Sequence, residues 1–158
     1  MKHFFLLVLL FIALSSTAQK TRDIDFVNFN YNVSSIALSG VEILIYKNKA
    51  NKKVIYKLEA KYYEGFKKKN KKIDISEEDF DKIIEAIVKI NTSDLVENFA
   101  SGLDGSITEL EFGTIFFNSI KFELWGVHKT QINTNLKSFI ETIQLVLKVA
   151  EINIEDYN

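Results

Sequence analysis

The chain has 158 residues, a hydrophobic content of 47% and a formal net charge of −1. This length suits one domain with one core, and so apolar a composition excludes a disordered protein. The absence of cysteine excludes disulfides, a cysteine nucleophile and a lipidated cysteine, so we expect neither thiol chemistry nor a lipid anchor.

The first 18 residues have the pattern of a secretory signal peptide. Lys2 gives positive charge, Phe4–Leu14 is apolar, and residues 15–18 are small. The apolar run has 11 residues, whereas a membrane-spanning helix needs about 20. We expect cleavage after Ala18, a single α+β domain over residues 19–158 and no membrane span. Abundant Lys, Asn and Ile have AT-rich codons and indicate a bacterial source, so the destination would be the periplasm or the medium.

Residues 23–63 predict strands. Asp23–Tyr31 alternates in part between apolar and polar residues, and Val33–Leu38 predicts a weaker second strand. Val41–Lys47 and Val54–Tyr63 alternate with period two, and the polar residues between them predict a turn, so the two segments should form a hairpin.

A lysine run follows at residues 67–72. Its members are candidates for an anion site: Lys67, Lys68, Lys69, Lys71 and Lys72. The alternative is an exposed loop or strand end. Residues 20–72 carry 13 basic and 5 acidic residues, whereas residues 73–158 carry 6 and 16, so the second half could neutralise the run. We therefore favour a weak polyanion contact at most, and no nucleic-acid binding, since the mature chain has only Arg22 for bidentate contacts.

Ser76–Ile90 predicts a helix. Ser76 is a suitable N-cap, acidic residues follow it in the first turn, and apolar residues recur at helical spacing. Thr92–Val96 predicts a further short helical turn, and the polar, glycine-containing segment Asn98–Ser106 predicts a loop.

The last third of the chain predicts a second strand pair and a helix. Ile107–Phe117 and Ile120–Lys129 would be joined at Asn118-Ser119, with Gly113 as a candidate bulge. A helix starting near Asn133 or Thr134 would bury apolar residues as far as Ala150. The acidic residues 151–158 would fray. These elements predict an α+β fold with an antiparallel sheet of two or more hairpins and two helices packed on one face, in the order β-β-α-β-β-α.

Residues suited to catalysis are few. Glu109 and Glu111 share one strand face, and a turn at Asn118-Ser119 would place Glu109 opposite His128, where a carboxylate and an imidazole could act as acid and base. The alternative, which we favour, is a solvated cross-strand ion pair. We expect no metal site and no cofactor.

Aromatic residues could form a binding surface on the sheet. The candidates are Tyr46, Tyr56, Tyr62 and Trp125. If they gathered on a sheet face without helices, the exposed patch would indicate a partner. The sequence therefore favours an exported, non-enzymatic binding module for a protein or surface ligand. The alternative is a small acid/base hydrolase or lyase that uses a Glu/His pair.

Overall fold

The computed structural model describes residues 24–33, 40–50, 53–97 and 105–157. The elements in chain order are β1 (Phe26–Val33), β2 (Val41–Ala50), β3 (Lys53–Glu64), β4 (Lys67–Ile75), α2 (Glu77–Val88), α3 (Thr92–Glu97), β5 (Ser106–Gly113), β6 (Ser119–Trp125), the 3₁₀ helix η1 (Lys129–Asn133) and α4 (Lys137–Ala150). The fold is α+β with an antiparallel sheet, which confirms the predicted class. In the described residues four strands precede α2, so the expected order β-β-α-β-β-α is wrong in its first half.

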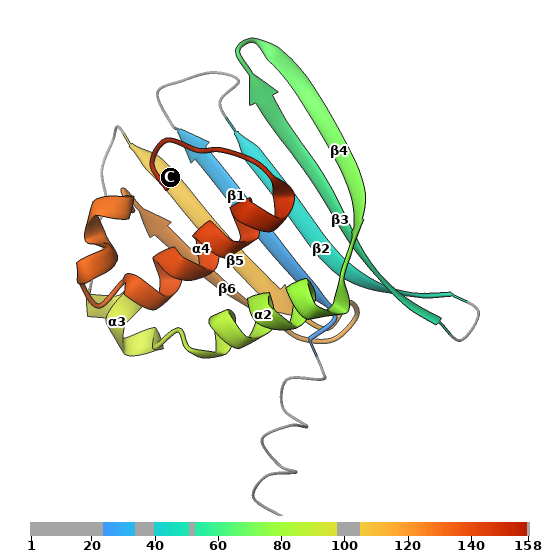
Figure 1. Ribbon diagram of the computed structural model, residues 1–158. Helices are drawn as coiled ribbons and strands as arrows, with labels where there is room; N and C mark the ends of the chain where they lie inside the picture. Colours follow the sequence, from blue (N-terminus) through green and yellow to red (C-terminus); the bar gives the residue numbers. More distant parts are fainter. Residues whose placement is uncertain (1–23, 34–39, 51–52, 98–104, 158) are drawn as a thin grey trace, which may run out of the picture.

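The six strands of the described chain form one open antiparallel sheet in the order β4-β3-β2-β1-β5-β6 (Figure 1). The first strand of the sequence therefore lies inside the sheet, between β2 and β5. The edges are β4 and β6.

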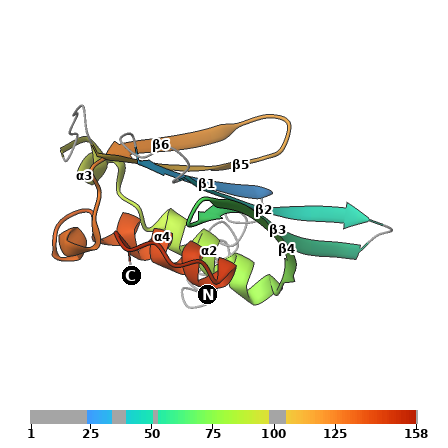
Figure 2. The ribbon, with the colours of Figure 1, turned by 90° about the horizontal axis from the view of Figure 1, so that it is seen from above.

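Helices α2 and α4 cover one face of this sheet, and the other face carries no helix from the described part of the chain (Figure 2). Strand alternation produces this asymmetry: Val27, Phe29 and Tyr31 of β1 are buried, while Asn28 and Asn30 between them are only partly buried on the opposite face. The helices complete the core with apolar stripes: Phe80, Ile83, Ile84 and Ile87 of α2, and Phe139, Ile140, Ile143, Val146, Leu147 and Ala150 of α4.

The ends of the helices follow local chemistry. The Ser76 hydroxyl accepts a hydrogen bond from the Asp79 amide at 3.0 Å, which satisfies an otherwise unpaired donor at the start of α2, as predicted. Helix α4 begins at Lys137, later than expected, because η1 occupies the preceding residues. It ends at Ala150, and the C-cap residue Glu151, with a φ of 53°, turns the chain out of the helix.

The hairpin of β2 and β3 is confirmed, with Ile43 opposite Ala60 and Ile45 opposite Leu58. The short helix after α2 is confirmed as α3. The predicted strand at 33–38 lies outside the described residues except for Val33, which ends β1. The predicted loop at 98–106 lies outside them as far as residue 104, and Ser106 already begins β5.

The structure places the lysine run within a strand. Lys67–Lys72 belong to β4, which pairs along its length with β3. The prediction of an exposed loop is therefore wrong, and the lysines occupy most of a strand rather than only its end. An edge strand accommodates this sequence because one of its sides faces solvent, and its lysines discourage pairing with another chain.

The predicted register of the second strand pair is wrong. The turn between β5 and β6 spans residues 114–118, so Glu109 lies opposite Glu123 rather than His128, and Trp125 lies opposite Ile107. A longer turn shifts every pairing along the hairpin.

The C-terminal tail, residues 151–157, does not fray. Ile152, Ile154 and Tyr157 are buried, and the Ile152 amide donates to the Leu147 carbonyl at 3.0 Å. The tail passes back over the sheet beside α4 (Figure 1). Its acidic composition suggested solvation, but these three apolar side chains extend the core beyond the last helix.

Candidate functional site

The sheet face without helices carries several ion pairs. Lys61 contacts Glu42 at 2.9 Å and Lys72 contacts Glu59 at 2.9 Å. Across β1, Lys121 contacts Glu109 at 2.7 Å. These charges neutralise one another within the molecule, so this face is not the contiguous apolar surface that a Tyr-rich binding site would present.

The aromatic candidates do not gather. Tyr46 lies on the face without helices, where its hydroxyl donates to Glu59 at 3.0 Å. Tyr56 lies on the other face and packs against Phe80, with ring centroids 5.0 Å apart. Tyr62 also packs against the core.

Trp125, at the end of β6, lies over Gly105 so closely that a Cβ there would be 2.5 Å from its ring. The indole therefore covers the start of β5. The four aromatic residues do not form one binding surface.

Most of the lysine run is neutralised within the molecule. Lys69 contacts Glu64 at 3.4 Å and Lys72 contacts Glu59. The Lys71 ammonium donates to Glu151 and to the Ala150 carbonyl, the latter at 2.9 Å, which joins β4 to the end of α4. Of the five candidates, Lys67 and Lys68 are exposed with no ion-pair partner among the described residues, so little charge remains for a ligand.

The structure separates the carboxylates from the imidazole. Glu109 lies on the face without helices, where its oxygens accept hydrogen bonds from Lys121 and from the Asn30 amide. The hydrogen bond from Lys121 holds the pKa of Glu109 below its usual range. A carboxylate held in its ionised form is a poor acid at neutral pH. Glu111 lies opposite Lys121 on the same face.

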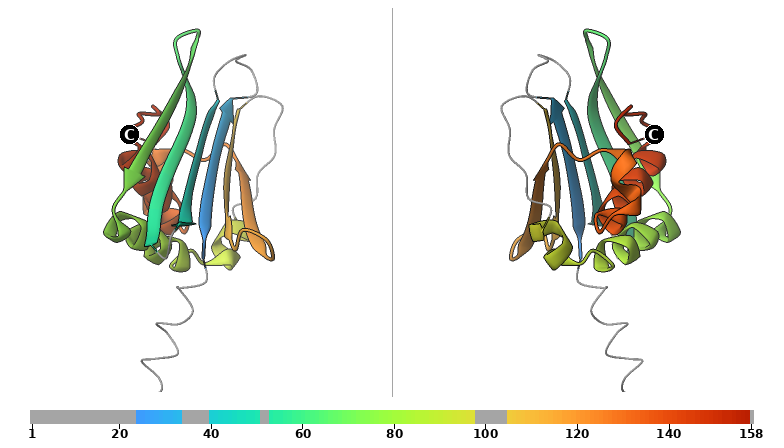
Figure 3. Two further views of the ribbon diagram at one scale, coloured as in Figure 1. Left: turned by 90° about the vertical axis from the view of Figure 1, so that its right-hand side faces the viewer. Right: turned by 90° about the vertical axis from the view of Figure 1, so that its left-hand side faces the viewer.

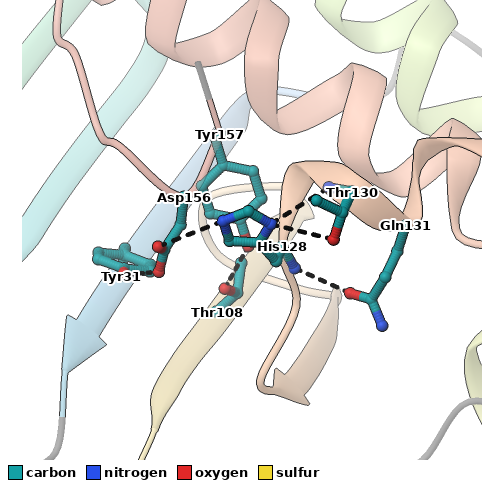
Figure 4. A network of polar contacts seen from close by, with 7 residues as sticks. All are labelled: Tyr31, Thr108, His128, Thr130, Gln131, Asp156 and Tyr157. Atoms are coloured by element: carbon teal, nitrogen blue, oxygen red, sulfur yellow. Dashed lines mark hydrogen bonds and ion pairs between the residues drawn. The ribbon is translucent and has the colours of Figure 1, made fainter.

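His128 belongs to a polar network on the helix-covered side (Figure 4). As the N-cap of η1, it accepts a hydrogen bond at Nδ1 from the Thr130 amide at 3.2 Å, and its own amide donates to the Gln131 side chain at 2.8 Å. Its Nε2 faces Asp156 Oδ1 at 3.8 Å. Nδ1 is therefore occupied by a structural hydrogen bond, whereas Nε2 lies beyond hydrogen-bond distance of Asp156 on a side chain that is 40% exposed.

The other end of this network is buried. The Tyr31 hydroxyl donates to Asp156, and Tyr157 shares a 2.5 Å hydrogen bond with Thr108. The two tyrosine rings meet edge to face with centroids 5.9 Å apart. Burial raises the pKa of both phenols above the usual value. The hydroxyls therefore stay protonated at neutral pH, and the network anchors the tail to β1 and β5.

The turn between β5 and β6 exposes apolar side chains. Phe116 and Phe117 are 86% and 85% exposed, and Ile115 and Ile120 are about half exposed. We call these four residues the apolar turn. Scattered apolar side chains are normal on a protein surface, whereas these four neighbouring ones form a local apolar patch at one end of a hairpin.

The geometry of the turn is fixed by its own backbone. The Thr114 amide donates to the Asn118 carbonyl at 2.9 Å, and the Thr114 hydroxyl accepts from the Asn118 amide at 3.1 Å. At the preceding Gly113, a Cβ would lie 2.0 Å from the Asn118 carbonyl oxygen. Gly113 therefore allows a close approach and is not the predicted bulge, since it pairs with Phe26 and Ser119.

An open groove of about 450 Å³ lies beside the apolar turn. It is lined by Asp25, Tyr46, Lys47, Asn48, Lys49, Ile115 and Phe116. Figure 3 shows this end of the sheet below and the turn between β3 and β4 at the opposite end. Of the aromatic candidates, only Tyr46 reaches the groove.

The sequence pattern does not indicate this surface, because the predicted strand continues to Phe117. The available signal was the run of apolar residues 115–117 directly before a predicted turn: a strand whose faces alternate does not need three consecutive apolar residues at its end.

In the described ranges, no group of three or more His, Asp or Glu side chains could hold a metal ion. No helix there has the length and apolarity to cross a membrane. Comparison with protein-family models gives no match, and comparison with curated proteins gives none either.

Proposed function

We propose that this protein is an exported, non-enzymatic binding module, released by cleavage after Ala18, whose contact surface is the apolar turn. The single observation that carries the proposal is the exposure of Phe116 and Phe117 at the end of the hairpin of β5 and β6. Two aromatic rings held in water are unfavourable for the isolated protein, and contact with a partner would remove them from water.

The polar groups support the same proposal. Glu109, Glu111 and His128 lie in two separate groups of contacts, and the partners of Glu109 and His128 are structural. The alternative, an acid/base hydrolase or lyase, required a carboxylate next to the imidazole, and these side chains are not adjacent. The neutralised lysines of β4 support only a weak, non-specific polyanion contact and no nucleic-acid site.

Site-specific photo-crosslinking tests the proposal. A benzoylphenylalanine placed at position 117 would be exported in the native host and irradiated. We expect defined adducts with one partner, because the ring at this position would be buried in the contact.

The matched control is the same substitution at Phe66. Phe66 is 91% exposed, stands beside Lys67 and lies in the turn at the opposite end of the sheet. Equal adducts at both positions, or none at position 117, would contradict a contact through the apolar turn.

A further inference from the structure

We propose that the partner of the apolar turn is the surface of a lipid bilayer, into which Phe116 and Phe117 insert. This inference rests on the proposed function above and specifies the chemistry of its partner. The protein would lie on a membrane without spanning it.

The shape of the turn favours a bilayer over a protein partner. Phe116 and Phe117 project from the end of a hairpin and are almost fully exposed, so their surface is convex. A stable protein interface involves about 20–30 residues on each side, whereas the apolar turn has four. A bilayer accepts an isolated apolar side chain without a preformed pocket, because side chains such as Phe are buried at the boundary of headgroups and acyl chains.

Lysines stand beside these aromatic side chains. Lys47 and Lys49 line the same groove as Ile115 and Phe116, and the Lys49 side chain is 72% exposed although it lies 4.0 Å from Asp25. The Lys47 ammonium lies 5.0 Å from the centroid of the buried Phe80 ring, so Lys49 is the lysine whose long stem would allow its ammonium group to reach a lipid phosphate while the aromatic rings lie deeper.

The acidic first turn of α2 limits this attraction. The Tyr56 hydroxyl donates to Glu77 at 2.8 Å, and Tyr56 lies opposite Lys47, so acidic side chains share this end of the molecule on its helix side. Insertion of the aromatic rings should therefore contribute more than charge, and anionic lipid should strengthen binding only moderately.

The chain enters the domain at the same end. The Asp25 amide donates to the Gly113 carbonyl at 2.7 Å, directly before the turn. Leu14, the last residue of the apolar N-terminal run, precedes Ile24 by 10 residues, which span at most about 35 Å. While the proposed signal peptide is still attached, it would hold this end toward the membrane, so export and the apolar turn favour the same orientation.

Vesicle flotation tests the inference. The exported protein would first be weighed by intact mass spectrometry to establish that Phe4–Leu14 has been removed, because that segment would bind lipid by itself. It would then be mixed with vesicles of phosphatidylethanolamine and phosphatidylglycerol, or of phosphatidylcholine alone. We expect the protein to float with both, more strongly with the anionic vesicles. Phe116→Ser/Phe117→Ser should weaken partitioning at least about tenfold, and Phe66→Ser should not.

A fluorescent probe gives a second measurement that does not depend on removing the rings. Because the natural chain has no cysteine, Phe117→Cys and Phe66→Cys each provide one labelling site for an environment-sensitive dye. We expect vesicles to shift the emission to shorter wavelength and to shield the dye from an aqueous quencher at position 117 only.

Two results would overturn the inference: no flotation with either vesicle, or equal shielding at positions 66 and 117. If the crosslink at position 117 then marks a protein, the binding module stands with a different partner. If that crosslink is also absent, both proposals fail.

Discussion

At the scale of single residues, Tyr157 holds the C-terminal tail against the sheet. Its ring is fully buried, and its hydroxyl pairs with the buried Thr108. No sequence pattern indicates this role, because a tyrosine seven residues after the last helix, among acidic residues, has the composition of a solvated tail. The pairing joins residues 49 positions apart, which no local pattern can predict.

We predict that stability falls at alkaline pH because of this tyrosine. Burial raises the pKa of Tyr157, so above the unfolded value of about 10 the unfolded chain loses a proton that the folded chain retains. Its stabilising contribution is complete below about pH 10 and disappears as the pH rises toward the folded pKa, by at most about 1.4 kcal/mol per pH unit. Urea unfolding at pH 9 and pH 11 measures the effect.

Tyr157→Phe is the control, since it keeps most of the ring packing and removes the titrating group. We expect the variant to be less stable at neutral pH, because Thr108 loses its partner, but to lose less stability between pH 9 and pH 11. An unchanged pH slope in the variant would show that Tyr157 does not titrate as proposed. Tyr31, whose pKa is also raised, should account for the loss of folding stability that remains in the variant at alkaline pH.

At the scale of elements, the spacing of apolar residues correctly predicted the elements that bury one regular face. The hairpin of β2 and β3 and helix α2 follow from alternation and from a capped apolar stripe. Strand β4 could not be recognised in the same way, because an edge strand with lysines on both faces has little apolar alternation. The register of β5 and β6 depends on the length of the turn between them. Because that length was predicted wrongly, the expected pairing of Glu109 with His128 was also wrong.

The tail provides a prediction at this scale. Deletion of residues 152–158 would remove the buried side chains of Ile152, Ile154 and Tyr157, together with the bond from Tyr31 to Asp156. We expect the unfolding free energy to fall by more than about 3 kcal/mol, as for the loss of a large core side chain. Chemical denaturation of the truncated chain is the measurement.

A matched change separates burial from chain length. Glu155→Ala alters an exposed residue of the same tail and should change the unfolding free energy by less than about 0.5 kcal/mol. If the truncated protein were as stable as the full chain, the tail would not belong to the core.

At the scale of the whole molecule, the basic first half and the acidic second half are joined in the described chain by two ion pairs, Lys57 with Asp74 and Lys71 with Glu151. Lys69 and Lys72 pair instead with carboxylates of their own half. The bond between Lys71 and Glu151 joins positions 80 apart, and it connects β4 to the end of α4. The overall imbalance between the halves could be counted from the sequence, but the pairing itself depends on the fold.

We therefore predict weak retention on heparin that is lost near physiological salt, where the Debye length is about 8 Å. Lys67→Gln/Lys68→Gln should abolish the retention, because these two lysines have no ion-pair partner in the described chain. Salt-gradient elution is the measurement. Retention that persists at high salt would instead indicate a specific anion site.

The position of β1 inside the sheet has a consequence for the order of folding. Strands β1 to β4 follow one another as neighbouring hairpins, so their pairings close short loops and can form early. Strand β5 must return across both intervening helices to reach β1, with Asn30 and Glu109 meeting over 79 positions. Until it does, the free edge of β1 can accept a strand from another molecule. A newly exported chain therefore has an interval in which domain swapping competes with completion of its own sheet.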